Sequence, residues 1–262
     1  MSALTKATRV TWSATRLKTY LTCPRQFKYV YVDGIPAIPT APLVFGGALH
    51  EALCFGHEQQ MISGQLPPTA SLLARFDALW QDALETDEPF FRAGGLTPPQ
   101  YVRTGHEILR AYAAAPDNAT APLAAELAFE LEIGGYGFTG VVDRLDEGKD
   151  GLVIVDFKSG ARKPTKADLE GDLQFTLYAL AIEGMLGRPV ERVVHYHLRD
   201  GSRFDVMPSK ERSEQLLVQV VPQVDGAISQ GEFAPKAGYW CNWCHYRELC
   251  RAENAIGNKE AK

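Results

Sequence analysis

Two aspartates in the segment GVVDRLDEGKDGLVIVDFKSG have a spacing that suits metal binding. The segment contains two strand-like runs on either side of the turn 148–151, so it is expected to form an antiparallel hairpin. If Glu147 pairs with Leu152, Asp143 lies opposite Asp156 on one face of that hairpin. Two carboxylates about 5 Å apart repel each other unless something positive lies between them. A divalent cation is the simplest group that would satisfy both.

Lys158 is expected on the same face as Asp156, because side chains two residues apart on a strand point the same way. Apolar residues occupy both faces of the run 152–155, which is typical of a buried central strand. Charged groups at the end of such a strand are costly unless they are paired or bound to metal. A simple salt bridge from Lys158 to one aspartate is the alternative, but it leaves the second carboxylate unbalanced.

The cysteines form a second candidate metal site. The run CNWCHYRELC has the close spacing of a metal-binding knuckle and contains Cys241, Cys244 and Cys250. Cys23 is a candidate fourth ligand because a proline follows it, as is common beside iron–sulfur clusters. His245 could instead complete a zinc site, and spacing alone does not separate zinc from iron–sulfur. Cys54 lies in an apolar helical pattern and is interpreted as a buried structural thiol.

Hydrophobic periodicity and turn residues predict the elements that must position these side chains. The order is helices first, then strands, then strands mixed with helices, without an internal repeat. Helices are expected from Ser13 onward and at 45–62, 70–84, 98–115, 168–186 and 209–228. Strands are expected at 126–133, 136–146, 151–157, 192–199 and 203–207, and a proline-rich loop at 35–43.

Composition excludes several classes of protein. With 262 residues, 45% of them hydrophobic, the chain can bury a sizeable core, so disordered, collagen-like and disulfide-scaffold proteins are excluded. No apolar run approaches the ~18 residues that a membrane span needs. The first residues, MSALTKATRV, also lack the apolar stretch of a secretory signal. A soluble, cytoplasmic protein without a membrane partner is therefore expected.

Charge is distributed unevenly along the chain. The net charge is −5, but residues 1–32 carry six cations and no acid, which leaves −11 on the remainder. A second acid-free patch contains Lys158, Arg162, Lys163 and Lys166. Both segments could hold phosphate, although ordinary solvated surface is the simpler interpretation of charge alone. The overall balance argues against a surface covered with nucleic acid and leaves room for a local basic groove.

Taken together, the motifs resemble the PD-(D/E)XK nucleases, in particular the branch with RecB-type nuclease domains and CRISPR-adaptation exonucleases. Asp143 followed by Asp156-Phe157-Lys158 matches the D...(D/E)xK core. The branch also shows a G-x-x-x-H helix, matched by Gly46 and His50, and Gln and Tyr four apart, matched by Gln174 and Tyr178. Its iron–sulfur members carry one cysteine before the core and three after it, as this chain does. The resemblance spans roughly residues 13–250.

The resemblance implies an α/β fold with a restriction-endonuclease-like core, a central mixed β-sheet flanked by helices. It further implies an N-terminal helix and a C-terminal cysteine knuckle joined by an iron–sulfur cluster. Residues 1–262 would form a single nuclease domain. Within it, 1–35 and 235–252 would form the cluster clasp, 45–115 a helical part and 124–230 the catalytic core.

The resemblance also assigns roles to single residues. His50, Asp143 and Asp156 would bind Mg²⁺ or Mn²⁺, and Lys158 would activate water or stabilise charge in the transition state. Gln174 and Tyr178 would hold substrate phosphate or position Lys158. Glu126 matches an acidic position often seen in this branch, either supporting the ligands or only ending a strand. A 4Fe–4S cluster would be held by Cys23, Cys241, Cys244 and Cys250, and would tie the two ends of the chain together.

The implied function is a metal-dependent deoxyribonuclease, an exonuclease acting on single-stranded DNA ends. It would serve DNA repair, recombination or CRISPR adaptation, with a helicase or CRISPR integrase as a partner. The alternative is a catalytically silent DNA-binding subunit of a helicase–nuclease complex, stabilised by a cluster or by zinc. Intact Asp143, Asp156 and Lys158 favour the enzyme.

Overall fold

The computed structural model describes residues 11–170 and 172–253, which divide into two compact units. Among these residues, the first unit comprises 11–37, 130–140 and 209–253, and the second comprises the rest. The two segments predicted to form a cluster clasp both fall in the first unit. The residues predicted to bind a catalytic metal all fall in the second.

The second unit is built on a mixed sheet. Its strands are β2 (Ala124–Ile133), β3 (Tyr136–Glu147), β4 (Leu152–Lys158), β5 (Val190–His197) and β6 (Ser202–Val206), with 130–140 belonging to the first unit. The order is β3-β4-β5-β6, and β2 also pairs with β3. β4 is antiparallel to β3 and parallel to β5, whereas β6 is antiparallel to β5. The predicted mixed sheet is therefore confirmed.

The predicted hairpin register is also confirmed. Glu147 pairs with Leu152, and the β3–β4 pairing continues to Arg144 opposite Val155, one pair before the two aspartates. The turn is tight, with the Gly148 amide donating to the Gly151 carbonyl at 2.8 Å. A Cβ on Gly151 would lie 2.5 Å from the Pro189 carbonyl oxygen, so glycine is required at that position.

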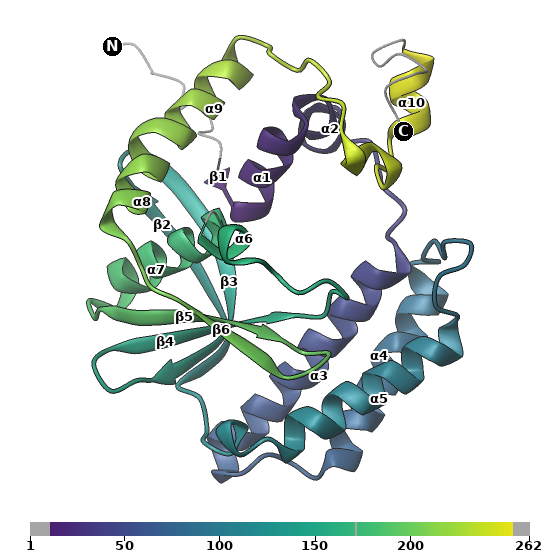
Figure 1. The fold of residues 1–262 in the computed structure, drawn as a ribbon, viewed down its shortest axis with the longest axis vertical. Coiled ribbons are helices and arrows are strands. Elements are labelled where there is room, and N and C mark those ends of the chain that lie inside the picture. Colours follow the sequence, from purple (N-terminus) through teal and green to yellow (C-terminus); the bar gives the residue numbers. More distant parts are fainter. Residues whose placement is uncertain (1–10, 171, 254–262) are drawn as a thin grey trace, which may run out of the picture. The chain divides into compact units, whose positions relative to one another are not determined.

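Helices cover both faces of this sheet. On one face, three helices lie side by side (Figure 1): α3 (Ala41–Ser63), α4 (Thr69–Thr86) and α5 (Pro98–Ala114). They share a core with Val155, Phe157 and Val194 of the sheet. On the other face lies α7 (Leu173–Leu186), whose Phe175 ring lies 6.1 Å from the His195 ring on β5. The strand β4 is therefore buried on both faces, as its apolar run predicted.

Two predicted boundaries in the second unit are wrong. The expected loop 35–43 ends early, because α3 begins at Ala41 with Pro42 in its first turn, where proline needs no amide hydrogen. The expected helix 168–186 is two helices, α6 (Lys166–Glu170) and α7. Asp172 separates them by capping α7: its carboxylate accepts a hydrogen bond from the Gln174 amide at 2.8 Å.

The first unit contains both ends of the described chain. Its short strand β1 (Thr11–Trp12) pairs in parallel with Gly137 and Phe138 of β3. The expected helix 209–228 is observed as a continuous helical run, although a π-helical turn precedes Pro222. The helical elements are α1 (Ala14–Thr22), α2 (Pro24–Phe27), η1 (Lys28–Val32), α8 (Lys210–Gln215), η3 (Leu216–Val220), α9 (Val221–Ser229), η4 (Tyr239–Asn242) and α10 (Arg247–Ala252). Of the helices described in either unit, none is both long enough and apolar enough to cross a membrane.

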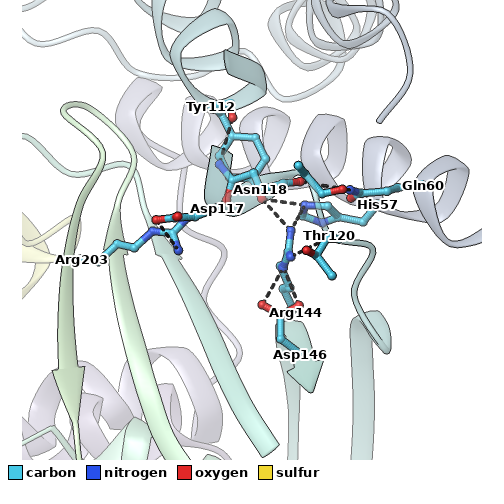
Figure 2. A network of polar contacts seen from close by, with 10 residues as sticks. His57, Gln60, Tyr112, Asp117, Asn118, Thr120, Arg144, Asp146 and Arg203 are labelled. Atoms are coloured by element: carbon cyan, nitrogen blue, oxygen red, sulfur yellow. Dashed lines mark hydrogen bonds and ion pairs between the residues drawn. The ribbon is translucent and has the colours of Figure 1, made fainter. Parts of the chain in front are cut away.

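A buried polar network joins β3 to the helices of the second unit (Figure 2). Arg144 is only 3% exposed, and its Nε donates to both carboxylate oxygens of Asp146, at 2.8 and 3.0 Å. Its other nitrogens donate to the Thr120 carbonyl at 3.0 Å and to Tyr112 Oη at 3.2 Å. Nη1 also lies 3.4 Å from Nε2 of His57, which in turn lies 2.8 Å from Tyr112 Oη. The network thus fixes β3 against α3 and α5.

His57 is held neutral by this arrangement. Arginine can only donate, so Nε2 of His57 must remain an acceptor. Burial, with the charge of Arg144 as a second cause, lowers the pKa of His57 to about 3. Its Nδ1 has no hydrogen-bond partner within the described residues, and the ring packs against Phe157 at 5.8 Å. His57 is therefore a structural residue of α3.

We expect acid to destabilise the fold through His57. Below about pH 6.5 the unfolded chain takes up a proton at this residue, whereas the folded chain does so only near pH 3. The free energy of unfolding should therefore fall as the pH drops from 6.5, with His57 contributing at most about 1.4 kcal/mol per pH unit. Thermal unfolding at pH 7, 6 and 5 of the wild type and of His57→Gln measures this contribution. Equal pH slopes for the two proteins would contradict it.

Candidate metal and active site

Three potential ligands of a metal ion converge where the β3–β4 pairing ends. His50 of α3, Glu126 of β2 and Asp143 of β3 each offer one ligand atom, and these atoms lie within 4.8 Å of one another. His50 Nδ1 lies 3.3 Å from Asp143 Oδ1. All three residues are half-buried. An imidazole and two carboxylates are a donor set that suits Mn²⁺ or Mg²⁺.

Glu126 enters the site through an unusual backbone conformation. Its φ is +45°, in the left-handed region that non-glycine residues rarely adopt. Strained conformations of this kind cluster at ligand-binding and catalytic positions. The sequence left the role of Glu126 open, since nothing in the strand pattern around it indicates an irregular backbone.

Asp156 is the most enclosed acidic side chain of the site, at 1% exposure. Its Oδ1 accepts hydrogen bonds from Lys158 Nζ at 3.0 Å and from Gln174 Nε2 at 3.2 Å. Lys158 Nζ also donates to Gln174 Oε1 at 3.2 Å, and Gln174 Nε2 donates to Tyr178 Oη at 2.6 Å. The structure therefore brings together four residues that the sequence singled out, and it places Gln174 where it orients Lys158.

One backbone contact connects this cluster with the potential metal ligands. The Phe157 amide donates to Asp143 Oδ2 at 2.6 Å, and the Phe157 ring lies edge-on to His50 at 6.1 Å. The predicted ligand set was His50, Asp143 and Asp156. Among the described residues, the set that meets the 4.8 Å spacing contains Glu126 instead, while Asp156 pairs with Lys158.

The electrostatics of the site favour bound positive charge. Burial raises the pKa of Asp156 to about 6, with Lys158 opposing the shift and Asp143 adding to it. Burial and the charge of Asp143 likewise raise the pKa of Glu126. Burial alone would lower the pKa of His50, but its hydrogen bond with Asp143 and the nearby carboxylates outweigh burial and raise it. A cation placed among these acids would relieve their mutual repulsion.

The cysteines of the first unit line one cavity. Cys23, Cys241, Cys244 and Cys250 are all free thiols and all border it. Three cations, Arg25, Lys236 and Arg247, line the same cavity and would balance thiolate charge. His245 is not among the lining residues. Cys54 belongs to the second unit and is half-buried rather than buried as expected, and burial raises its pKa to about 11.

The spacing of these thiols differs from that of a single-ion site. Zinc–sulfur bonds of about 2.3 Å would place tetrahedral ligands roughly 4 Å apart. Among the described cysteines, no three sulfur atoms lie within 4.8 Å of one another.

The aromatic residues of the knuckle divide into two kinds. Tyr246 is buried, and Trp240 lines the cavity with its Nε1 donating to the Lys236 carbonyl at 2.9 Å. Tyr239 and Trp243 are instead 77% and 64% exposed. Only the first pair can keep solvent from the cysteines.

The two basic patches are less positive in space than in sequence. Lys158 pairs with Asp156, Arg162 with Asp168, and Lys163 with Asp200, while the side chain of Lys166 lies outside what the structure describes. In the N-terminal segment, Lys28 pairs with Asp33 and Arg25 with Glu253. Lys6 and Arg9 lie outside the described residues.

Comparison with solved structures shows the same fold elsewhere. The 2.19 Å crystal structure of a protein from Eubacterium rectale, provisionally described as an exonuclease, is 14% identical in sequence, with a TM-score of 0.54. The match covers 100% of this chain and 97% of that one. The protein SSO0001 is 13% identical, with a TM-score of 0.40 over 96% of this chain and 90% of its own.

Sequence comparison places the chain in a family. None of the curated proteins compared with the chain matches it. The profile of the PD-(D/E)XK nuclease superfamily matches residues 11–251, which include the hairpin aspartates and the lysine that follows them. The chain therefore belongs to the PD-(D/E)XK nuclease superfamily.

Proposed function

We propose that this protein is a metal-dependent deoxyribonuclease that hydrolyses phosphodiester bonds, acting as an exonuclease on single-stranded ends. The observation that carries the proposal is the convergence of His50, Glu126 and Asp143 beside the buried Asp156–Lys158 pair. Family membership supports nuclease activity, and the related fold from Eubacterium rectale supports exonuclease action.

The residues divide the work of hydrolysis between them. His50, Glu126 and Asp143 would hold Mg²⁺ or Mn²⁺, with Asp156 directly beside them. When bound, the cation supplies Lewis-acid polarisation of the phosphoryl oxygen and acidifies water. Lys158 has three donor hydrogens, of which Asp156 and Gln174 accept two. The third is available to stabilise charge that develops on the phosphate.

We further propose that the cysteine cavity holds a 4Fe–4S cluster. Four free thiols and three cations around one cavity support this assignment, as does the resemblance to the iron–sulfur members of the family. The cluster would be a structural clasp, because it would link α1 to the knuckle near α10. Protein contacts already join η1 and the residues after it to the C-terminal part of the first unit: Tyr29 Oη donates to Glu253 at 2.6 Å, and Tyr246 Oη donates to the Ile35 carbonyl at 2.8 Å.

Single-stranded DNA is the substrate that the first unit favours. Tyr239 and Trp243 expose flat rings on which unpaired bases could stack. Lys158, Arg162 and Lys163 of one basic patch are ion-paired, as are Arg25 and Lys28 of the other, which favours a narrow contact with a flexible strand over a broad contact with a rigid duplex. The resemblance to RecB-type and CRISPR-adaptation nucleases supports a role in repair, recombination or adaptation, beside a helicase or an integrase.

Removing the buried carboxylate should abolish catalysis without unfolding the protein. We expect Asp156→Asn and Asp143→Ala each to lose hydrolysis of labelled single-stranded DNA with Mn²⁺ or Mg²⁺. In EDTA, the unfolding temperature of Asp156→Asn should equal or exceed that of the wild type, because burial destabilises the charged carboxylate. Wild-type cleavage rates in either variant would contradict the site, as would inactivity of the wild type with both metals.

The cysteine cavity makes a separate prediction. Protein purified without oxygen should be brown and contain about four irons per chain. Cys23→Ala should lose the colour, whereas Cys54→Ala, a matched control outside the cavity, should keep it. Metal analysis and visible absorbance measure both, and stoichiometric zinc in a colourless wild type would contradict the cluster.

Substrate preference can be measured apart from cleavage. Metal-free Asp156→Asn protein should bind single-stranded oligonucleotides more tightly than matched blunt duplexes. Its affinity should fall steeply with salt, because phosphate contacts release counterions. Trp243→Ala should weaken binding of the single strand. Tighter binding to the duplex, or no salt dependence, would contradict the proposed substrate.

A further inference from the structure

Arg199 differs from the cations of the basic patch that contains Lys158. Lys158, Arg162 and Lys163 each have a carboxylate partner within 4.0 Å. Arg199 has no such partner among the described residues. It lies two residues after the end of β5 and is half-buried, in a turn that the sequence did not mark as functional.

The arginine is nevertheless firmly positioned. Its Nε donates to the Ser159 carbonyl at 2.8 Å, and its guanidinium carbon lies 5.8 Å from the centre of the Phe45 ring. The preceding amide, of Leu198, donates to the Lys158 carbonyl at 2.9 Å. These contacts orient the guanidinium but leave its two terminal nitrogens without a hydrogen-bond partner in the described part of the chain.

The contacts place Arg199 beside the candidate active site. Ser159 follows Lys158 directly, and a Cβ on Gly46 of α3 would lie only 2.8 Å from Ser159 Oγ. Gly46 precedes His50 by four residues, which corresponds to about one helical turn, or ~5.4 Å along the axis. Ser159, whose carbonyl accepts the hydrogen bond from Arg199, therefore contacts α3 roughly one turn before the potential metal ligand His50, on the same face of the helix.

Arg144 shows what a structural arginine looks like in this protein. All three of its guanidinium nitrogens donate to oxygens of Asp146, Thr120 and Tyr112 inside the fold. Arg199 uses only Nε, and its terminal nitrogens are neither satisfied nor enclosed. A guanidinium held by Nε presents two parallel N–H groups, which match two oxygens of a phosphate.

We propose that Arg199 binds a phosphate of the nucleic acid strand next to the phosphate that is cleaved. The inference rests on the proposed nuclease function and adds a specific contact to it. Arg199 would hold the strand in register while the groups around Asp143 and Asp156 act on the neighbouring phosphodiester. It would therefore be a substrate-binding residue.

A chemical double-mutant cycle tests this contact. Single-stranded oligonucleotides, each with one neutral methylphosphonate at a successive position, are cleaved by the wild type and by Arg199→Gln. Loss of one charged hydrogen-bonded contact should lower kcat/KM about 10- to 100-fold. At one position the methylphosphonate should lower the kcat/KM of the wild type by about this factor. At the same position it should not lower the kcat/KM of Arg199→Gln any further. Arg199→Lys, which keeps the charge, should recover part of the loss.

Arg192→Gln is the matched control, because Arg192 lies on β5, the strand that leads to Arg199, and pairs with Glu191 and Asp205. It should show the wild-type profile. The same cycle in binding, with metal-free Asp156→Asn protein, separates the two claims. Suppose that the wild type cleaves no oligonucleotide but that the effects of Arg199→Gln and of one methylphosphonate on binding remain non-additive. This result would overturn the proposed nuclease function and support the contact between Arg199 and the phosphate. Additive losses at every position, in cleavage and in binding, would overturn the Arg199 contact alone.

Discussion

The antiparallel pairing of β3 with β4 is the constraint on which the second unit depends. Side chains alternate between the faces of a strand, so one register places Asp143 and Asp156 on one face and Arg144 on the other. A slip of one residue would place Arg144 on the same face as Asp156 and move Asp143 to the opposite face. The tight turn at Gly148 and the contact of Gly151 with Pro189 exclude that slip.

Buried charge is balanced on one face of this hairpin and unbalanced on the other. Arg144 is surrounded by enough acceptors to satisfy every guanidinium nitrogen, so its charge is inert and its role is to hold helices. On the other face, Lys158 cannot balance Asp143, Asp156 and Glu126 together. Charges inside a protein interact strongly. The unbalanced negative charge of these carboxylates therefore attracts a cation to this face of the hairpin.

Local sequence patterns predicted the strands, the hairpin register and most helices, because alternation and tight turns act over a few residues. The family resemblance, rather than a local pattern, named Gln174 and Tyr178 beside Asp156 and Lys158, and the structure brings these four residues together. Features that depend on distant segments were missed. The pairing of Lys163 with Asp200 neutralises a patch that looked free of acid, and Arg199 reaches its place only because β5 lies beside β4. The split between α6 and α7 had a visible signal in Asp172, a residue type that favours helix starts.

The left-handed backbone at Glu126 has a consequence for the evolution of the chain. Glycine adopts this conformation freely, whereas other residues pay about 1–2 kcal/mol for it. Selection for folding alone would therefore replace the glutamate with glycine, and only selection that acts through its carboxylate would retain it. In a library varied at position 126, selection for folding alone should therefore enrich glycine, whereas selection for the function of the carboxylate should retain glutamate.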